Sequence, residues 1–187
     1  MSVFGGSAWS FNENRQQFYL HQHFSFQPDL NFRNPSVVEE MKSALDFWLD
    51  HGVDGFTFST AAFLVEDENL TDEPESGLTD DQNDYEYLLH NFTINQEESR
   101  MILKEFTKHI KDFSAIDGRE RVSIFAAAHL APESLYSYYS PISDFPLNTI
   151  FLDVNHETNA DDFADKIIKW TYNIPQGTFY KYIQSKI

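Results

Sequence analysis

Ser59 and His129 are the two residues whose types could support nucleophilic chemistry, since each stands at or just beyond the end of a short apolar run. A serine hydroxyl is a poor nucleophile near neutral pH unless a base takes its proton. A Ser59–His129 dyad is therefore one hypothesis, and an ordinary pocket serine beside a surface histidine is the interpretation that we favour. Neither run carries a carboxylate at its end that could serve instead.

A second chemical candidate is the acidic stretch 66–86, which holds ten Asp or Glu residues and no Lys or Arg. Asp80, Asp81 and Asp84 could offer oxygen ligands to Ca²⁺, but the stretch lacks the spacing of an EF-hand loop. A solvated loop is the favoured interpretation. The chain has no Cys, which excludes a thiolate metal site and a disulfide framework. We therefore expect no metal and no cofactor.

The whole chain has 187 residues and a formal charge of −17. This charge argues against a nucleic-acid partner and against docking on an anionic membrane, because both need clustered Lys and Arg. No apolar run reaches the 18 residues of a membrane-spanning helix. Residues 1–7 lack the basic start and apolar stretch of a signal peptide.

The elements that would position these groups alternate along the chain. Apolar residues at three- and four-residue spacing predict helices, and short apolar runs predict buried parallel strands. Helices are expected at 37–51, 94–113 and 161–172, and strands at 53–60, 121–128, 149–154 and from 179, with one further strand at 18–24. This order predicts an α/β fold with parallel strands, and it does not separate part of a barrel from a doubly wound sheet.

Several segments are specific enough to indicate a family. Residues 27–35 read QPDLNFRNP and residues 47–56 read FWLDHGVDGF. They are joined by VFGGSAW at 3–9, YLHQ at 19–22, VVEEM at 37–41, GLTDD at 77–81 and Asp84-Tyr85. Together these segments resemble the insect maltases (α-glucosidases) of glycoside hydrolase family 13, the α-amylase superfamily. The heavy chains of heteromeric amino-acid transporters are the nearest non-enzymatic kin of that family.

This resemblance implies a (β/α)₈ barrel, also called a TIM barrel, with a small domain inserted after its third strand. Residues 1–35 then correspond to the end of the inserted domain, and residues 36–187 to the middle of the barrel, about strands 4 to 7. A complete barrel needs about 250 residues. We therefore expect the partners of this chain to be other chains or the missing parts of the same barrel.

The resemblance also indicates where the catalytic groups of a maltase would stand. The nucleophilic Asp of the family motif G-F-R-I-D-A corresponds to Ser59, and the Arg of that motif to Thr57. The acid/base Glu of the T-E-A motif corresponds to Ala126. The stretch 181–187 should approach the motif that precedes the third carboxylate, yet it contains no Asn-His-Asp.

These replacements predict that the protein is not an enzyme. A retaining glycosidase needs one carboxyl group to attack the sugar and a second to protonate the leaving oxygen. Ser59 is a poor substitute for the first, and Ala126 has no proton to give. The resulting expectation is a non-catalytic, maltase-like glycoprotein (a pseudoenzyme) that acts by binding a ligand or by protein assembly.

Two alternatives stay open. The protein is an active α-glucosidase, hydrolysing maltose- or sucrose-type α-glucosides, if two strands are misaligned or another chain supplies the carboxylates. It is a storage or structural protein if the fold is kept for stability alone. A transporter heavy chain would contact a membrane only through a segment that is not in this chain.

The residues around the altered positions are the candidates for a ligand pocket. They are Phe58, Ser59, Phe63, Phe125, Ala126 and His129, with His21 from the YLHQ segment. Their apolar members could accept a small apolar molecule that the protein carries, although ordinary barrel core is the favoured interpretation of the rings. For His21, a packing role competes equally with a sugar-facing one.

Two N-glycosylation motifs occur, at Asn69-Leu70-Thr71 and Asn91-Phe92-Thr93. Each marks a surface position that would carry a glycan in a secreted protein. Together with the resemblance, they predict an extracellular or cell-surface location.

Overall fold

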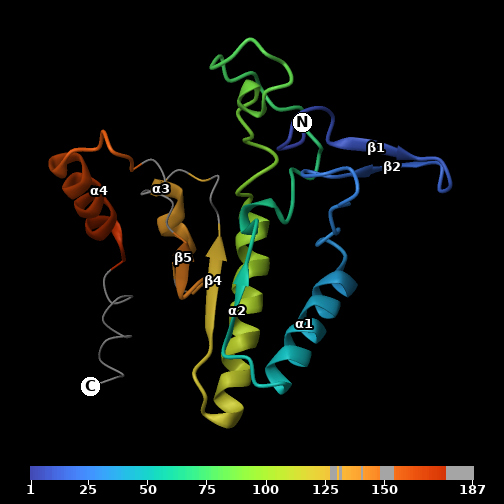
Figure 1. Cartoon of the computed structure of the whole chain (residues 1–187). Helices are drawn as coiled ribbons and strands as arrows, with labels where there is room; N and C mark the ends of the chain where they lie inside the picture. The colour runs from blue at the N-terminus through green and yellow to red at the C-terminus, as the bar shows by residue number, and fades with distance from the viewer. Residues whose placement is uncertain (127–129, 131, 140, 148–153, 176–187) are drawn as a thin grey trace. The chain divides into compact units, whose positions relative to one another are not determined.

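The computed structural model describes residues 1–126, 130, 132–139, 141–147 and 154–175 (Figure 1). The chain forms two compact units. We call residues 1–38 and 63–99 the hairpin unit, and residues 39–62 and 100–187 the sheet unit. The predicted domains, 1–35 and 36–187, stay a prediction about the complete protein.

The hairpin unit is named after its two antiparallel strands, β1 (Trp9–Asn12) and β2 (Gln17–Leu20). Trp9 pairs with Leu20 and Asn12 pairs with Gln17. The Asn12 side chain accepts a hydrogen bond of 3.0 Å from the backbone amide of Arg15, which fixes the turn. The strand expected at 18–24 therefore exists, but it is shorter and begins one residue earlier.

The acidic stretch 66–86 is a loop, as expected. Its last residues lead into the short 3₁₀ helix η2 (Tyr85–Tyr87), whose first turn is capped by the Asp84 carboxylate on the Glu86 amide at 3.0 Å. An isolated bridge between Glu75 and Leu88 closes the loop on itself. The loop is thus ordered by a side-chain cap and by backbone hydrogen bonds of its own rather than by long helices or strands.

Helix α1 (Pro35–Asp50) matches the helix expected at 37–51. Asn34 accepts a hydrogen bond from the Ser36 amide at 3.0 Å, and Pro35 occupies the first turn, where its missing N–H costs nothing. Gly52 ends the helix with φ +87°, a conformation that favours glycine, and its amide bonds to the Leu49 carbonyl.

The sheet unit contains three parallel strands in the order β3-β4-β5, namely β3 (Gly55–Phe58), β4 (Val122–Ala126) and β5 (Phe145–Leu147). Gly55 pairs with Val122, and a Cβ at Gly55 would come within 2.3 Å of the Val122 carbonyl oxygen. Only glycine lets β3 and β4 approach in this way. The predicted parallel sheet is confirmed for β3 and β4.

Strand β5 was not predicted. The apolar pattern predicts the next strand at 149–154, but residues 148–153 lie outside the described part of the chain, as does the strand expected from 179. Val154, the one described residue of the former range, is not in a strand. Between β4 and β5 lie α3 (Pro132–Leu135) and the 3₁₀ helix η3 (Tyr136–Tyr138).

Helix α2 (Glu97–Asp117) precedes β4, and α4 (Ala160–Asn173) follows β5. Leu103, Phe106 and Ile110 form the buried stripe of α2, as their spacing predicts. Asn159 caps α4 by accepting from the Asp162 amide at 2.9 Å. None of the helices that the structure describes combines the length and hydrophobicity needed to cross a bilayer.

Candidate functional site

The carboxyl ends of β3 and β4 are the candidate site. Phe58 pairs with Phe125 in the parallel register, so Ser59, the residue after β3, and Ala126, the last residue of β4, come to the same edge of the sheet. This edge is where barrel proteins carry their functional groups. The two positions that the resemblance assigned to the nucleophile and the acid/base are therefore neighbours.

The side chains of β3 point alternately to opposite faces of the sheet. Phe58 faces α2, because its ring lies 6.0 Å from that of Phe106 and 4.8 Å from that of Phe125. Thr57 lies on the other face and is exposed, and Ser59 beyond it is exposed as well. The two candidate rings Phe58 and Phe125 thus belong to the packing between sheet and helix, and this geometry supports the core interpretation.

A polar network behind the sheet fixes β4. The Asp144 carboxylate accepts from the Ser123 amide at 2.8 Å and forms an ion pair with Lys111 of α2 at 2.8 Å. Thr107 of α2 donates to the Ser123 hydroxyl at 3.2 Å. Each of these polar groups has a partner, and together they hold the first residues of β4 in place.

An ion pair made by a buried arginine also supports the start of β4. Arg121 is 1% exposed, and its guanidinium donates to both carboxylate oxygens of Asp117, at 2.8 and 2.7 Å. These hydrogen bonds hold the pKa of the Asp117 carboxyl well below its usual range. The pair joins the end of α2 to the start of β4 and so fixes the position of this strand relative to the helix.

The candidate site offers hydroxyl groups from Thr57 and Ser59, and Ala126 contributes only a methyl group. His129 lies outside the described residues, so the Ser59–His129 dyad is not placed. Residues 181–187, where the third carboxylate motif was sought, also lie outside them.

The remaining two candidates, His21 and Phe63, belong to the hairpin unit and are buried. The His21 ring bonds to the Ser10 hydroxyl at 2.9 Å and to the His23 carbonyl at 3.3 Å. Phe63 meets the His23 ring edge-on at 5.2 Å. Both side chains therefore act in packing within this unit, and a role toward a ligand stays a prediction.

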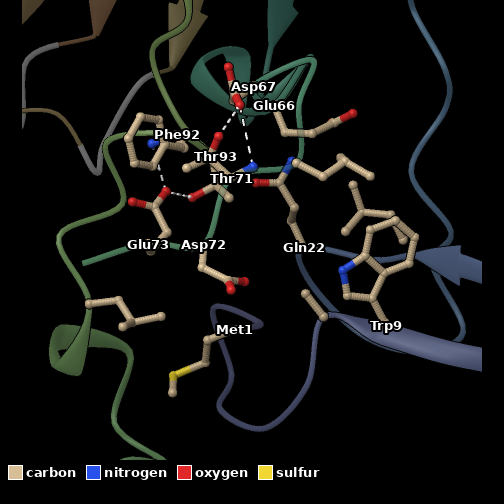
Figure 2. A pocket seen from close by; sticks show the side chains of 14 residues that line it. Met1, Trp9, Gln22, Glu66, Asp67, Thr71, Asp72, Glu73, Phe92 and Thr93 are labelled. Carbon is tan, nitrogen blue, oxygen red and sulfur yellow. Dashed lines mark hydrogen bonds between the residues drawn. The ribbon is translucent and has the colours of Figure 1, made fainter. Parts of the chain in front are cut away.

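Sequence analysis missed a cavity of about 320 Å³ in the hairpin unit (Figure 2). Its lining combines four carboxylates with two aromatic rings, namely Glu66, Asp67, Asp72 and Glu73 with Trp9 and Phe92. Two of the carboxylates serve the surrounding loops. Asp67 accepts from the Thr71 hydroxyl at 2.6 Å, and Glu73 accepts from the Phe92 amide at 2.7 Å.

These acidic side chains do not assemble a metal site. Within the described part of the chain, no group of three or more His, Cys, Asp or Glu side chains is placed to hold a metal ion. This includes Asp80, Asp81 and Asp84, the Ca²⁺ alternative. The sequence feature that accompanies this cavity is the high negative charge of the 66–86 stretch. Charge alone, however, does not predict that a loop encloses a cavity.

The two glycosylation motifs are displayed on the surface of the hairpin unit. Asn69 and Asn91 are both exposed. The threonine of each motif is held by a carboxylate, Thr71 by Asp67 at 2.6 Å and Thr93 by Glu73 at 2.9 Å. Each motif is therefore fixed by its neighbours while its asparagine stays accessible.

Curated proteins similar to this chain include maltases. Maltase 1 of Drosophila virilis is 39% identical over 184 residues, which cover 95% of this chain and 29% of that protein. The salivary alpha-glucosidase of Aedes aegypti is 36% identical over 178 residues, covering 91% and 31%. The amino acid transporter heavy chain SLC3A1 of Mus musculus is 37% identical over 184 residues, covering 95% and 27%.

These relatives contradict the prediction that the protein is not an enzyme. The maltases and alpha-glucosidases among them are named glycoside hydrolases. Ser59 and Ala126 still stand at the positions where the family motifs carry carboxylates. The error was to infer the activity of a whole protein from two positions in a chain that spans about a third of its relatives' length.

Solved structures agree on the fold. An alpha-glucosyl transfer enzyme, XgtA, superimposes with a TM-score of 0.78 at 27% identity, covering 95% of this chain and 34% of that one. The trehalose-6-phosphate hydrolase of Bacillus licheniformis reaches a TM-score of 0.72 at 20% identity, over 95% and 31%. The model of the alpha amylase catalytic domain matches residues 1–186. The predicted fold is confirmed, and the chain belongs to the alpha-amylase catalytic domain family.

Proposed function

We propose that the protein binds α-glucosides at the carboxyl edge of β3 and β4. The observation that supports this proposal is the shared edge of Ser59 and Ala126, in a chain whose relatives are named maltases and alpha-glucosidases. A sugar presents many hydroxyl groups, and the exposed Thr57 and Ser59 hydroxyls can both donate and accept hydrogen bonds. The methyl group of Ala126 leaves room for a sugar ring.

Hydrolysis at this edge requires two carboxyl groups, about 5 to 5.5 Å apart for a reaction that retains configuration. Residues 55–60 and 122–128 contain none. The groups that would attack the sugar and protonate the leaving oxygen must then come from other segments of the same barrel or from a partner chain. An apolar ligand gains no support, because Phe58 and Phe125 pack with α2 instead of facing the open side.

The test is a calorimetric titration of the complete protein with maltose, beside cellobiose as the β-linked control. We expect saturable binding of maltose and none of cellobiose at equal concentration. Absence of maltose binding would overturn the proposal. Release of p-nitrophenol from p-nitrophenyl α-glucoside by the same preparation then measures hydrolysis, and its inhibition by maltose shows whether turnover uses the same site.

A second candidate is a role as the heavy chain of a membrane transporter. The support is the 37% identity to the SLC3A1 heavy chain over 184 residues, which lies between the 39% identity to maltase 1 and the 36% identity to the salivary alpha-glucosidase. Co-expression with an amino-acid transporter light chain tests it. Co-purification in detergent together with increased amino-acid uptake would support this candidate, and unchanged uptake would contradict it.

Both candidates place the protein outside the cell or at its surface, as a glycoprotein. The support is the word "salivary" in the names of two relatives and the exposure of Asn69 and Asn91. Treatment of the native protein with peptide N-glycosidase should lower its mass, and Asn69→Gln together with Asn91→Gln should remove that shift. A protein without glycan at either position would contradict this assignment.

A further inference from the structure

A second cavity, of about 370 Å³, lies in the hairpin unit and differs from the first in its chemistry. It is lined by residues of the β1–β2 hairpin (Figure 1) and of the loop that follows, namely Asn12, Arg15, Gln17, Phe18, Tyr19, Ser25, Phe26 and Pro28. No carboxylate is among them, although the chain carries 30 Asp and Glu. We call this cavity the hairpin groove.

The two aromatic rings that line the hairpin groove, Phe18 and Phe26, are each supported by contact with a neighbouring ring. Phe18 packs against its cross-strand partner Phe11, with ring centres 5.0 Å apart. Phe26 stacks on Phe24 at 5.0 Å and 8°. Phe24 in turn stacks on Phe4 at 4.0 Å. Phe18 and Phe26 are nevertheless 67% and 77% exposed, so each ring is supported by a neighbour while much of its surface stays open.

The polar side of the hairpin groove is also fixed. The Tyr19 hydroxyl donates to the Ser25 carbonyl at 2.7 Å and ties β2 to the loop. The Asn12 side chain holds the backbone amide of Arg15 at 3.0 Å. A site whose walls and turn are set before a ligand arrives loses little entropy on binding.

Arg15 is a positively charged residue in a strongly acidic unit. The hairpin unit has 14 Asp and Glu residues and only two cations, Arg15 and Arg33. Arg33 is paired with Glu66 and Glu98. Within the described residues, the guanidinium of Arg15 has no such partner. A free guanidinium presents a planar fork of donors that matches a carboxylate.

We propose that the hairpin groove binds a small carboxylate that carries a flat apolar ring. The guanidinium of Arg15 bonds the carboxylate, the amides of Asn12 and Gln17 flank it, and the ring stacks on Phe18 and Phe26. This site is independent of the α-glucoside proposal, since all of its residues belong to the hairpin unit and none is at the ends of β3 and β4.

The test is fluorescence titration of the complete protein with 1-naphthoate, beside the uncharged 1-naphthamide. We expect saturable binding of naphthoate and at least about tenfold weaker binding of the amide, since a hydrogen bond to a charged group contributes roughly 1.5 to 3 kcal/mol. Arg15→Gln should weaken naphthoate binding by a similar factor. Lys104→Gln removes an equal charge from the exposed side of α2 and should change nothing.

Two further variants separate binding from loss of structure. Arg15→Lys keeps the charge but not the fork and should fall between the wild type and Arg15→Gln. Phe26→Leu keeps an apolar side chain without the ring and should weaken both probes equally. Equal affinity for naphthoate and naphthamide, unchanged affinity of a folded Arg15→Gln protein, or no saturable binding would each overturn the proposal.

Discussion

The hairpin unit and the sheet unit are stabilised in different ways. In the sheet unit, the apolar stripe of α2 packs on strands through Phe58, Phe106 and Phe125. In the hairpin unit, the long acidic loop is held by single polar contacts. Arg33, for example, binds Glu66 at the start of that loop and Glu98 in the first turn of α2. We therefore expect the truncation of apolar side chains to destabilise the sheet unit most. The removal of charged side chains should destabilise the hairpin unit most.

The largest effect is expected from Phe106→Ala in the sheet unit. Phe106 is 1% exposed, and truncating a buried Phe costs about 3 to 5 kcal/mol of unfolding free energy. Urea unfolding followed by circular dichroism measures this loss. The control is Ile116→Ala on the same helix, where Ile116 is 82% exposed and the expected change is within about 0.5 kcal/mol. Equal losses in the two variants would contradict the assigned packing.

The second-largest loss of stability is expected from Arg33→Ala in the hairpin unit. Arg33→Ala removes two ion pairs, at 3.3 and 2.8 Å, and leaves half-buried carboxylates without their cation. We expect a loss of about 1 to 3 kcal/mol. Arg15→Ala, which removes an unpaired arginine from the same unit, should cost within about 0.5 kcal/mol. If both variants unfold at the same urea concentration, the loop does not depend on Arg33.

Asp29 and Asp117 should respond to pH in opposite directions. Burial raises the pKa of Asp29 in the hairpin unit above the ordinary value of 3.8, so its contribution to stability is complete below pH 3.8 and is lost as pH rises through the raised pKa. Hydrogen bonds from Arg121 lower the pKa of Asp117 in the sheet unit, so its contribution is present above pH 3.8 and is lost as pH falls.

Urea midpoints between pH 3 and 6 measure this difference. The stability of Asp29→Asn relative to the wild type should increase as pH rises. The stability of Asp117→Asn relative to the wild type should decrease over the same range. The same pH slope in both variants would show that the two carboxylates do not differ in environment.

A smaller effect is expected at His90 in the hairpin unit. Burial lowers the pKa of His90 below 6.5, although its hydrogen bond to the Tyr85 carbonyl at 2.6 Å acts in the opposite sense. The neutral ring is therefore favoured in the folded state, and stability falls as pH drops from 6.5 through the lowered pKa. His90→Gln, whose amide can still donate to Tyr85, should flatten the stability curve between pH 5 and 7. An unchanged curve would refute the assignment.

The two units also differ in how well the sequence predicted them. The sheet unit has long periodic patterns, and the expected helices at 37–51, 94–113 and 161–172 match α1, α2 and α4 within a few residues. Strand β5 was missed because Pro146 stands in its centre, and proline is usually read as a strand breaker. In the hairpin unit, the 66–86 loop has no periodicity, so only its polarity could be predicted.

The candidate site was predicted only in part. The short apolar runs at 53–60 and 121–128 predicted the two strands, and the family resemblance placed Ser59 and Ala126 at their carboxyl ends, which lie at one edge of the sheet. It did not show that Phe58 and Phe125 face α2, which depends on the helix that covers each face. The hairpin groove was missed because Phe18, Phe26 and Arg15 form it through a loop that returns to the hairpin.

The most direct test of the central claim is maltose binding by Ser59→Trp in the complete protein. We expect the indole to fill the open edge beside Ala126 and abolish binding, while Ser43→Trp on the exposed side of α1 should bind maltose like the wild type. Equal binding by the wild type and both variants would contradict the claim, because the sugar would then be held away from the ends of β3 and β4.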